Sequence, residues 1–447
     1  MTRFDVFDLL LHAPRAICGN VGEPDRAVDV GVRGGRITAV EPFGALTDPA
    51  GRGLDVELTL SPGLVLLPGL VDPHVHVGEP GHADWEGFTA ATRGAAAGGI
   101  TTLVDMPLDS VPVTTTVAAL AAKRAAAHNK CLVNVEFWGG VVPTNLDSLP
   151  DLLAAGVRGF KCFLADSGSA ELPPLDARQL ALAMTATAAL DTPLLVHAES
   201  AADLARAPVA SGRDYRSFLA SRPERAELSA VQLVIDTARR TGARVHVVHL
   251  SSAAALPLLA AARRGGVAVT VETCPHYLTL AAEDVGDGAT EYAACPPIRS
   301  RANADALWAG LADGEIDLVA SDHSPCAAEL KHLDSGDFGL AWGGISSLQW
   351  SLPIMWTAAQ QRGFTLNHLV QWMSRRPADL IGLPAKGRIA VGADADLVAF
   401  DPNATTIADP TRWEHRQHIT PYAGRRLSGA IIRTWVAGRS VWPPESS

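Results

Sequence analysis

The chain has few cysteines and no run of basic residues, and each absence excludes a class of protein. Its six cysteines are scattered over 447 residues without a paired spacing, which argues against a disulfide framework or a structural zinc knot. The formal net charge of -11 argues against a nucleic-acid partner. No segment approaches the ~20 consecutive apolar residues of a membrane span, and the first residues form no convincing secretion signal. We therefore expect a cytoplasmic protein with neither a nucleic-acid nor a membrane partner.

What the chain does contain is a large apolar fraction arranged in alternating segments. Hydrophobic residues make up 47% and charged residues 19% of the chain, which is ample material for a packed core. From GLVLLPGLVDPHVH to IDLVASDH, apolar β-branched segments alternate with Ala-rich or amphipathic helical segments. Near-continuous apolar strands indicate a parallel sheet covered by helices. Eight such units predict an α/β fold with a TIM-type (β/α)8 barrel. An open doubly wound sheet is the alternative, although no G-x-G-x-x-G turn follows the first strand.

The two ends of the chain have a different pattern. Residues 1–64 contain short alternating strands with a hairpin signal in AVDVGVRGGRITAVEP, and residues 386–447 repeat that pattern in GRIAVGADADLVAFDP. Neither end has enough strands for a stable sheet of its own. We expect both ends to meet in one small β-sandwich domain beside a barrel formed by residues 65–385.

Six ionisable residues fall where the predicted barrel strands end. Enzymes of this fold carry their chemistry at the carboxyl ends of the strands. The residues at these positions are His74, His76, Lys161, His197, His249 and Asp322. Imidazole and carboxylate groups are the ligands that borderline divalent metals prefer. The pattern predicts that these side chains converge on one metal site at the mouth of the barrel.

Three of these positions are informative by themselves. His74 and His76 point to the same side of a strand because the side-chain period there is two, and neighbouring imidazoles favour a shared metal over a core role. A buried Lys161 tends to lose its proton, and a neutral amine can take up carbon dioxide to form a carbamate with two metal-binding oxygens. Lys161 could instead be a salt-bridge partner or a Schiff-base amine.

Other histidines near the predicted site have structural alternatives. His246 stands three residues before His249 on the same strand, so it should face the other way and pack against helices. His276, in ETCPHYLTL, is either a residue that supports the site or contacts substrate, or a structural one. His323, next to Asp322, either orients its loop or has a structural role.

Nine stretches of sequence carry a resemblance to a known family. They are GLVDPHVHVGEPG, WEGFTAATRGAAAGGITTLVDMPLDSVPVTT, GFKCFLADSG, HAES, HVVHLSS, ETCPHYL, CPPIRS, SDHSPC and AWGGISSLQ. Over residues 69–349 the chain resembles the cyclic amidohydrolases of the amidohydrolase superfamily. GFKCFLADSG and SDHSPC followed by AWGGI are most similar to the allantoinase group.

The resemblance implies a binuclear metal centre. By position, His74, His76 and Asp322 would hold one ion, and His197 and His249 would hold the other. Lys161, carboxylated on its amine, would bridge the two ions. The ions would be zinc, with cobalt or manganese as alternatives, and the protein would be a homotetramer.

The resemblance also bears on the substrate, which would be a cyclic ureide. Dihydroorotase-like enzymes carry an arginine where this chain has Gly78, and hydantoinases and dihydropyrimidinases carry a tyrosine where it has Asp166. Both differences favour hydrolysis of allantoin to allantoate, with Asp322 as the catalytic proton acceptor. Asp109 and Cys295 replace a usual asparagine and serine, and we expect them to contact substrate. The alternatives are a hydantoinase or dihydropyrimidinase acting on another cyclic ureide and, more remotely, a non-catalytic scaffold.

Overall fold

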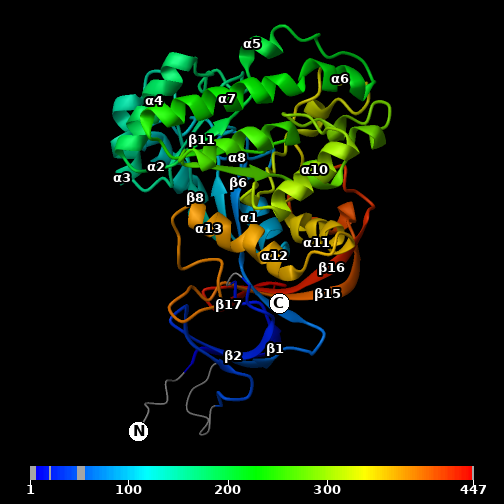
Figure 1. Cartoon of the computed structure of the whole chain (residues 1–447). Helices are drawn as coiled ribbons and strands as arrows, with labels where there is room; N and C mark the ends of the chain where they lie inside the picture. Colours follow the sequence, from blue (N-terminus) through cyan, green and yellow to red (C-terminus); the bar gives the residue numbers. More distant parts are fainter. Residues whose placement is uncertain (1–6, 20–21, 48–55, 445–447) are drawn as a thin grey trace.

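The computed structural model describes residues 7–19, 22–47 and 56–444, and its architecture is mixed α/β. The predicted α/β class is therefore confirmed. Figure 1 shows strands from the two ends of the chain lying together below a larger body of helices and strands. The predicted outer domain limits, residues 1 and 447, lie outside the described residues.

Strands from both ends of the chain form one eight-stranded sheet, in the order β17-β16-β15-β5-β1-β2-β3, with β4 paired to β1. The strands are β1 (Leu9–Ala16), β2 (Arg26–Arg33), β3 (Arg36–Pro42), β4 (Val56–Thr59), β5 (Val65–Pro68), β15 (Leu397–Ile407), β16 (Arg426–Val436) and β17 (Arg439–Trp442). The antiparallel pair of β5 and β15 joins the N-terminal and C-terminal portions. Buried side chains from both portions share one core cluster, because neither portion alone covers its apolar face.

The first predicted barrel strand is two strands. Residues 65–68, which we expected in the barrel, pair with β1 and β15 in the eight-stranded sheet formed by the two chain ends, which we call the end sheet. The predicted strand is interrupted at Gly69, where an added Cβ would lie 2.1 Å from the hydroxyl oxygen of Thr101. Only the second half, β6 (Leu70–Val75), pairs with β7 (Ile100–Asp105) in the body of the molecule.

Parallel strands form the centre of that body, in two sheets ordered β6-β7-β8 and β14-β13-β12-β11-β10-β9. The remaining strands are β8 (Asn134–Phe137), β9 (Gly139–Gly140), β10 (Phe160–Phe163), β11 (Leu194–His197), β12 (Val245–Val247), β13 (Val269–Thr273) and β14 (Leu318–Val319). Only Trp138 separates β8 from β9. At the other end, Val75 of β6 forms a parallel bridge with His323, which follows β14.

Helices follow most of these strands along the chain and surround them (Figure 1). They are α1 (Phe88–Ala97), α2 (Val117–Ala127), α3 (Leu149–Ala154), α4 (Ala177–Ala189), α5 (Ala201–Leu204), α6 (Tyr215–Ser221), α7 (Glu224–Thr241), α8 (Leu256–Arg264), α9 (Pro275–Thr279), α10 (Arg301–Ala312), α11 (Ser351–Gln361), α12 (Leu366–Val370) and α13 (Arg376–Leu380). Among the described residues, we find no helix with the length and apolar character needed to cross a membrane.

Helix α7 illustrates how the sequence both forms an element and positions the site. Its buried residues include Ala230, Val231 and Val234, at the three- and four-residue spacing of an amphipathic helix. The helix ends at Gly242, whose φ of 72° suits a left-handed cap. Near its start, the buried carboxylate of Glu227 accepts two backbone N–H bonds from the segment that follows His249, each 3.0 Å long.

Candidate metal centre

The six predicted ligands line one cavity of about 340 Å³ at the carboxyl ends of the parallel strands. They are His74, His76, Lys161, His197, His249 and Asp322. All six residues are at most 9% exposed. The structure therefore brings together side chains that are spread over most of the chain, as the sequence predicted. That they bind metal stays a prediction.

His74, His76 and Asp322 form the first cluster of potential ligand atoms. Oδ1 of Asp322 lies 3.2 Å from Nε2 of His74 and 3.5 Å from Nε2 of His76. The three ligand atoms lie within 4.8 Å of one another, which suits a single cation. Burial alone would raise the pKa of Asp322, but the neighbouring imidazoles hold it well below its usual value, so the group is a carboxylate.

His197, His249 and Lys161 form the second cluster. Nδ1 of His197 lies 2.9 Å from Nε2 of His249. The Lys161 amine is buried without a hydrogen-bond partner among the described residues. Burial lowers the pKa of this amine to about 8, which makes its neutral form accessible. A partnerless amine beside converging imidazoles fits a carbamate and a bound cation, because both would satisfy polar atoms that the protein leaves unpaired.

Carboxylates behind three of the imidazoles fix their orientation. Nδ1 of His74 lies 2.5 Å from Oε1 of Glu272, and Nε2 of His197 lies 2.8 Å from Oε2 of Glu199. Nδ1 of His76 lies 2.6 Å from Oδ2 of Asp109. If each of these nitrogens donates its proton to the carboxylate, the opposite nitrogen keeps its lone pair facing the cavity.

The sequence interpretation missed Glu272 and Glu199 and gave Asp109 a different role. Glu199 follows His197 by two residues in HAES, and a carboxylate at that spacing could have been read as its support. Asp109 was expected to contact substrate. It lines the cavity, as Cys295 does, but its carboxylate is also the partner of His76.

His246 is placed differently from the prediction. Its Nε2 lies 3.0 Å from Oε2 of Glu272, in the interior beside the ligand cluster and not against helices. The prediction is wrong because β12 ends at Val247, and His249 has a φ of 40° in the left-handed region. The regular alternation of a strand therefore does not extend from one histidine to the other.

The other two histidines have distinct surroundings. His323 is buried, its carbonyl oxygen accepts the N–H of His76 at 2.9 Å, and its Nδ1 accepts the N–H of Ser347 at 3.1 Å. These bonds support the prediction that it orients the loop beside Asp322. His276 is buried, neither ring nitrogen has a hydrogen-bond partner among the described residues, and burial lowers its pKa to about 4.

Comparison with known proteins places this chain in a family. The model of the amidohydrolase family matches residues 65–441. The chain belongs to the amidohydrolase family. An allantoinase of Streptomyces avermitilis is 52% identical over 434 residues, which cover 97% of this chain and 95% of that protein. Allantoinases of Arabidopsis thaliana and Escherichia coli are 44% and 37% identical, covering 85% and 98% of this chain and 78% and 96% of theirs.

Solved structures of related amidohydrolases agree in fold over almost the whole chain. An L-hydantoinase (dihydropyrimidinase) of Arthrobacter aurescens has a TM-score of 0.90 at 29% identity, covering 97% of this chain and 96% of that one. A D-hydantoinase (dihydropyrimidinase) of a Thermus species has a TM-score of 0.85 at 26% identity, covering 97% and 94%. Membership of this family makes the protein a metal-dependent hydrolase of cyclic amides.

One wall of the cavity in this amidohydrolase is held by a buried lysine. Nζ of Lys331 donates to the carbonyl oxygens of Gly344 and, at 2.9 Å, of Trp342. Between them, Gly343 packs so closely on the cavity residue Cys295 that an added Cβ would lie 2.6 Å from its Sγ. Among the described residues, this buried amine bonds only carbonyl oxygens, and it thus fixes the backbone that faces the ligand cluster.

We predict that Lys331→Met raises KM by about tenfold or more and changes kcat less, because each buried carbonyl left unpaired costs about 1–3 kcal/mol and the wall would relax. Steady-state kinetics of the amidohydrolase reaction measure both constants. Lys386→Met is the control, since that buried lysine pairs with Asp396 at 2.7 Å beside the end sheet. It should lower stability and leave KM unchanged. An unchanged KM in Lys331→Met, or an equal rise in the control, would contradict the assignment.

Proposed function

We propose that this protein is an allantoinase, which opens the five-membered ring of allantoin by hydrolysing its cyclic amide to give allantoate. The observation that carries the proposal is the 52% identity to a curated allantoinase over 434 residues. The convergence of six potential ligands on one cavity supports it. The related hydantoinase structures share the fold at lower identity.

We propose that the cavity holds two divalent cations, with zinc first and cobalt or manganese as alternatives. His74, His76 and Asp322 would hold one ion, and His197 and His249 the other. Lys161, carboxylated by carbon dioxide, would bridge both. Bound there, the cations would lower the pKa of a water molecule and polarise the ring carbonyl.

In this proposal Asp322 is the catalytic base. Its ionised carboxylate faces the cavity beside His74 and His76 and would accept the proton of the attacking water. The same group would then deliver that proton to the departing ring nitrogen. Asp109, Glu199 and Glu272 would keep the imidazoles oriented throughout.

Gly78, two residues after the second histidine of the His-x-His pair, argues against a dihydroorotase-like substrate. Gly78 has a φ of 74°, and an added Cβ would lie 3.0 Å from the carbonyl oxygen of His82. An arginine there would be strained, so the loop has no place for the carboxylate-binding side chain of those relatives. Asp166 lines the cavity but bonds the backbone N–H of Gly168 at 3.0 Å, and it supplies no phenol.

We further propose a closed (β/α)8 barrel, with the end sheet as the β-sandwich domain. The two parallel sheets meet at two places, and both support closure. β8 is almost continuous with β9, and Val75 of β6 forms a bridge with His323, which follows β14. Apart from residues 65–68, the domain limits stay those proposed from the sequence. We also propose that the protein is a homotetramer in the cytoplasm, and the family resemblance supports the tetramer.

Rates measured side by side on allantoin, hydantoin and dihydrouracil test the substrate. We expect kcat/KM for allantoin to exceed the other two by about 100-fold, since a site built for the ureido side chain loses binding energy with substrates that lack it. Metal analysis of protein purified without chelator should give two equivalents. Equal or faster turnover of hydantoin or dihydrouracil would favour the hydantoinase alternative. Metal-free, inactive protein would favour the scaffold.

A further inference from the structure

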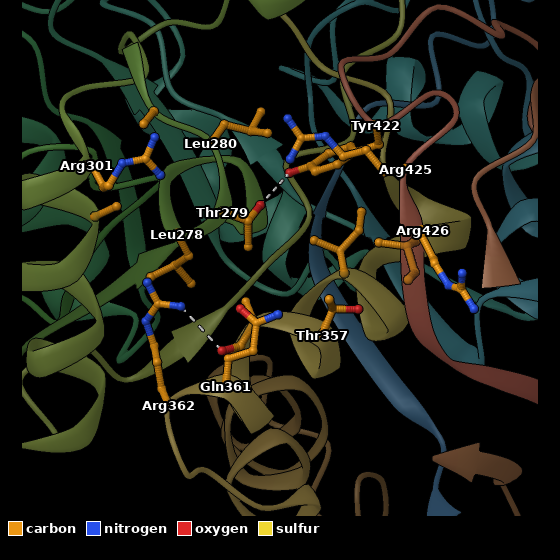
Figure 2. Close-up of a pocket in the computed structure, with 15 residues that line it drawn as sticks. Leu278, Thr279, Leu280, Arg301, Thr357, Gln361, Arg362, Tyr422, Arg425 and Arg426 are labelled. Atoms are coloured by element: carbon orange, nitrogen blue, oxygen red, sulfur yellow. Dashed lines mark hydrogen bonds between the residues drawn. The ribbon is translucent and has the colours of Figure 1, made fainter. Parts of the chain in front are cut away.

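A second cavity, distinct from that of the ligand cluster, is lined by four arginines. It has a volume of about 270 Å³ and lies between α9, α10, α11 and the start of β16. Figure 2 shows Arg301 and Arg362 on one side of it and Tyr422 with Arg425 on the other, with Thr279 between them. Arg426 extends away from the other three. We call this cavity the arginine pocket.

The charges around the arginine pocket do not cancel. None of the 15 described residues that line it is acidic, in a chain whose net charge is -11. Arg301 pairs with Asp284 at 2.7 Å, and Arg362 pairs with Asp305 at 2.8 Å. Neither carboxylate belongs to the lining.

Arg425 and Arg426 have no carboxylate partner among the described residues. Arg425 donates only to neutral oxygens, to the carbonyl of Pro421 at 3.2 Å and to the hydroxyl of Tyr292 at 3.4 Å. No hydrogen bond or ion pair of the Arg426 side chain is present in the described part of the chain. Glu283, whose carboxylate accepts the backbone N–H of Arg301 at 3.0 Å, is a third acidic group beside the pocket. Four guanidinium groups and three carboxylates leave a local charge of +1.

The rest of the pocket suits an organic molecule. Its floor is apolar and includes Leu278, Ile354 and Leu427, the last of them 5% exposed. The hydroxyl oxygens of Tyr422 and Thr279, 3.3 Å apart, add neutral hydrogen-bonding groups. Guanidinium groups whose N–H donors have no other partner bind carboxylate and phosphate oxygens through charge-assisted, often bidentate hydrogen bonds.

We propose that the arginine pocket binds a small organic anion, such as a dicarboxylate or a phosphate monoester, with a charged group on the arginines that face the pocket and its body on the apolar floor. The positive local charge favours an anion, and a cavity of this volume holds no more than a small metabolite. The pocket is separate from the cavity of the metal centre, with which it shares no lining residue.

Calorimetric titration of the full-length, metal-loaded protein tests the proposal. The probes are succinate and phenyl phosphate as dianions, acetate as a monoanion and chloride at matched ionic strength. We expect one saturable site per chain for at least one dianion, and at least tenfold weaker binding in Arg425→Gln/Arg426→Gln. The control is Arg239→Gln/Arg240→Gln, an adjacent arginine pair at the end of α7, which should bind as the unaltered protein does.

The metal centre could also bind these anions, so the titration is repeated in Lys161→Ala. Binding that persists there and is lost in the Arg425/Arg426 double variant supports the arginine pocket, whether or not allantoin is the substrate. Binding lost in Lys161→Ala, equal loss in the control, or no saturable binding would overturn the proposal. Sedimentation of the Arg425/Arg426 variant as a smaller species would also overturn it, because the pocket would then be covered by a second copy of the chain.

Discussion

Asp322→Asn is expected to lower kcat for allantoin by about 10³-fold or more while most of the bound metal is retained. The amide keeps the size of the carboxylate and one oxygen able to face His74 and His76, but it cannot accept a proton. A positioned general acid or base raises the rate of the catalysed reaction by about 10²–10⁴-fold. The neighbouring imidazoles keep the pKa of Asp322 well below its usual value, so the native group is ready to act as a base at neutral pH. Allantoate formation and elemental analysis measure the two quantities.

The matched control for this variant is Asp313→Asn, an exposed position at the end of α10. It makes the same chemical change away from the cavity and should leave kcat and metal content unchanged. Turnover by Asp322→Asn within a few-fold of the unaltered enzyme would remove this residue from the role of base. Loss of metal from the variant would instead show that its main contribution is as a ligand.

Lys161→Ala is expected to lose both metal and nearly all activity, by about 10³-fold or more, because the bridge between the two proposed ions disappears. The alanine leaves space where the side chain stood, beside the ring of Phe163, which lies 4.9 Å from the native amine. Formate or acetate should enter that space and restore part of the activity, since their carboxylates replace the two carbamate oxygens. Initial rates at increasing acid concentration measure the rescue.

Lys161→Arg separates this explanation from a simple loss of positive charge. Arginine keeps the charge but forms no carbamate, and its larger side chain leaves no space for an added acid. We therefore expect it to be inactive and not rescued. Full turnover by Lys161→Ala without acid, or an active Lys161→Arg, would show that Lys161 is not a carboxylated bridge.

The ligand positions were predictable from sequence because they obey local rules. His74 and His76 follow from the two-residue period of a strand, and Lys161 is conspicuous as a charge within an apolar segment. His197 and Asp322 stand at the ends of apolar segments in the same way. These positions need only the knowledge that parallel strands present their carboxyl ends to one side.

Apart from Glu199, which stands two residues after His197, the supporting groups were not predictable because they depend on long-range contacts. Glu272 lies within β13 and bonds His74 on β6, nearly 200 residues earlier in the chain. His246 was misplaced because the strand-end geometry at His249 departs from the regular period. Lys331 acts on backbone carbonyls, whose positions are set by the path of a loop and leave no mark in the sequence pattern.

The sheet assembled from both chain ends has a consequence for biosynthesis. β5 ends at Pro68, and its antiparallel partner β15 begins only at Leu397, after every strand of the catalytic body has been made. A nascent chain leaving the ribosome therefore carries an open edge along β5 until translation is almost complete. Premature termination would yield a polypeptide that holds every candidate ligand yet exposes the unpaired backbone N–H and C=O groups of β5. Such a polypeptide would be a target for chaperones and proteases before it could act as a catalyst.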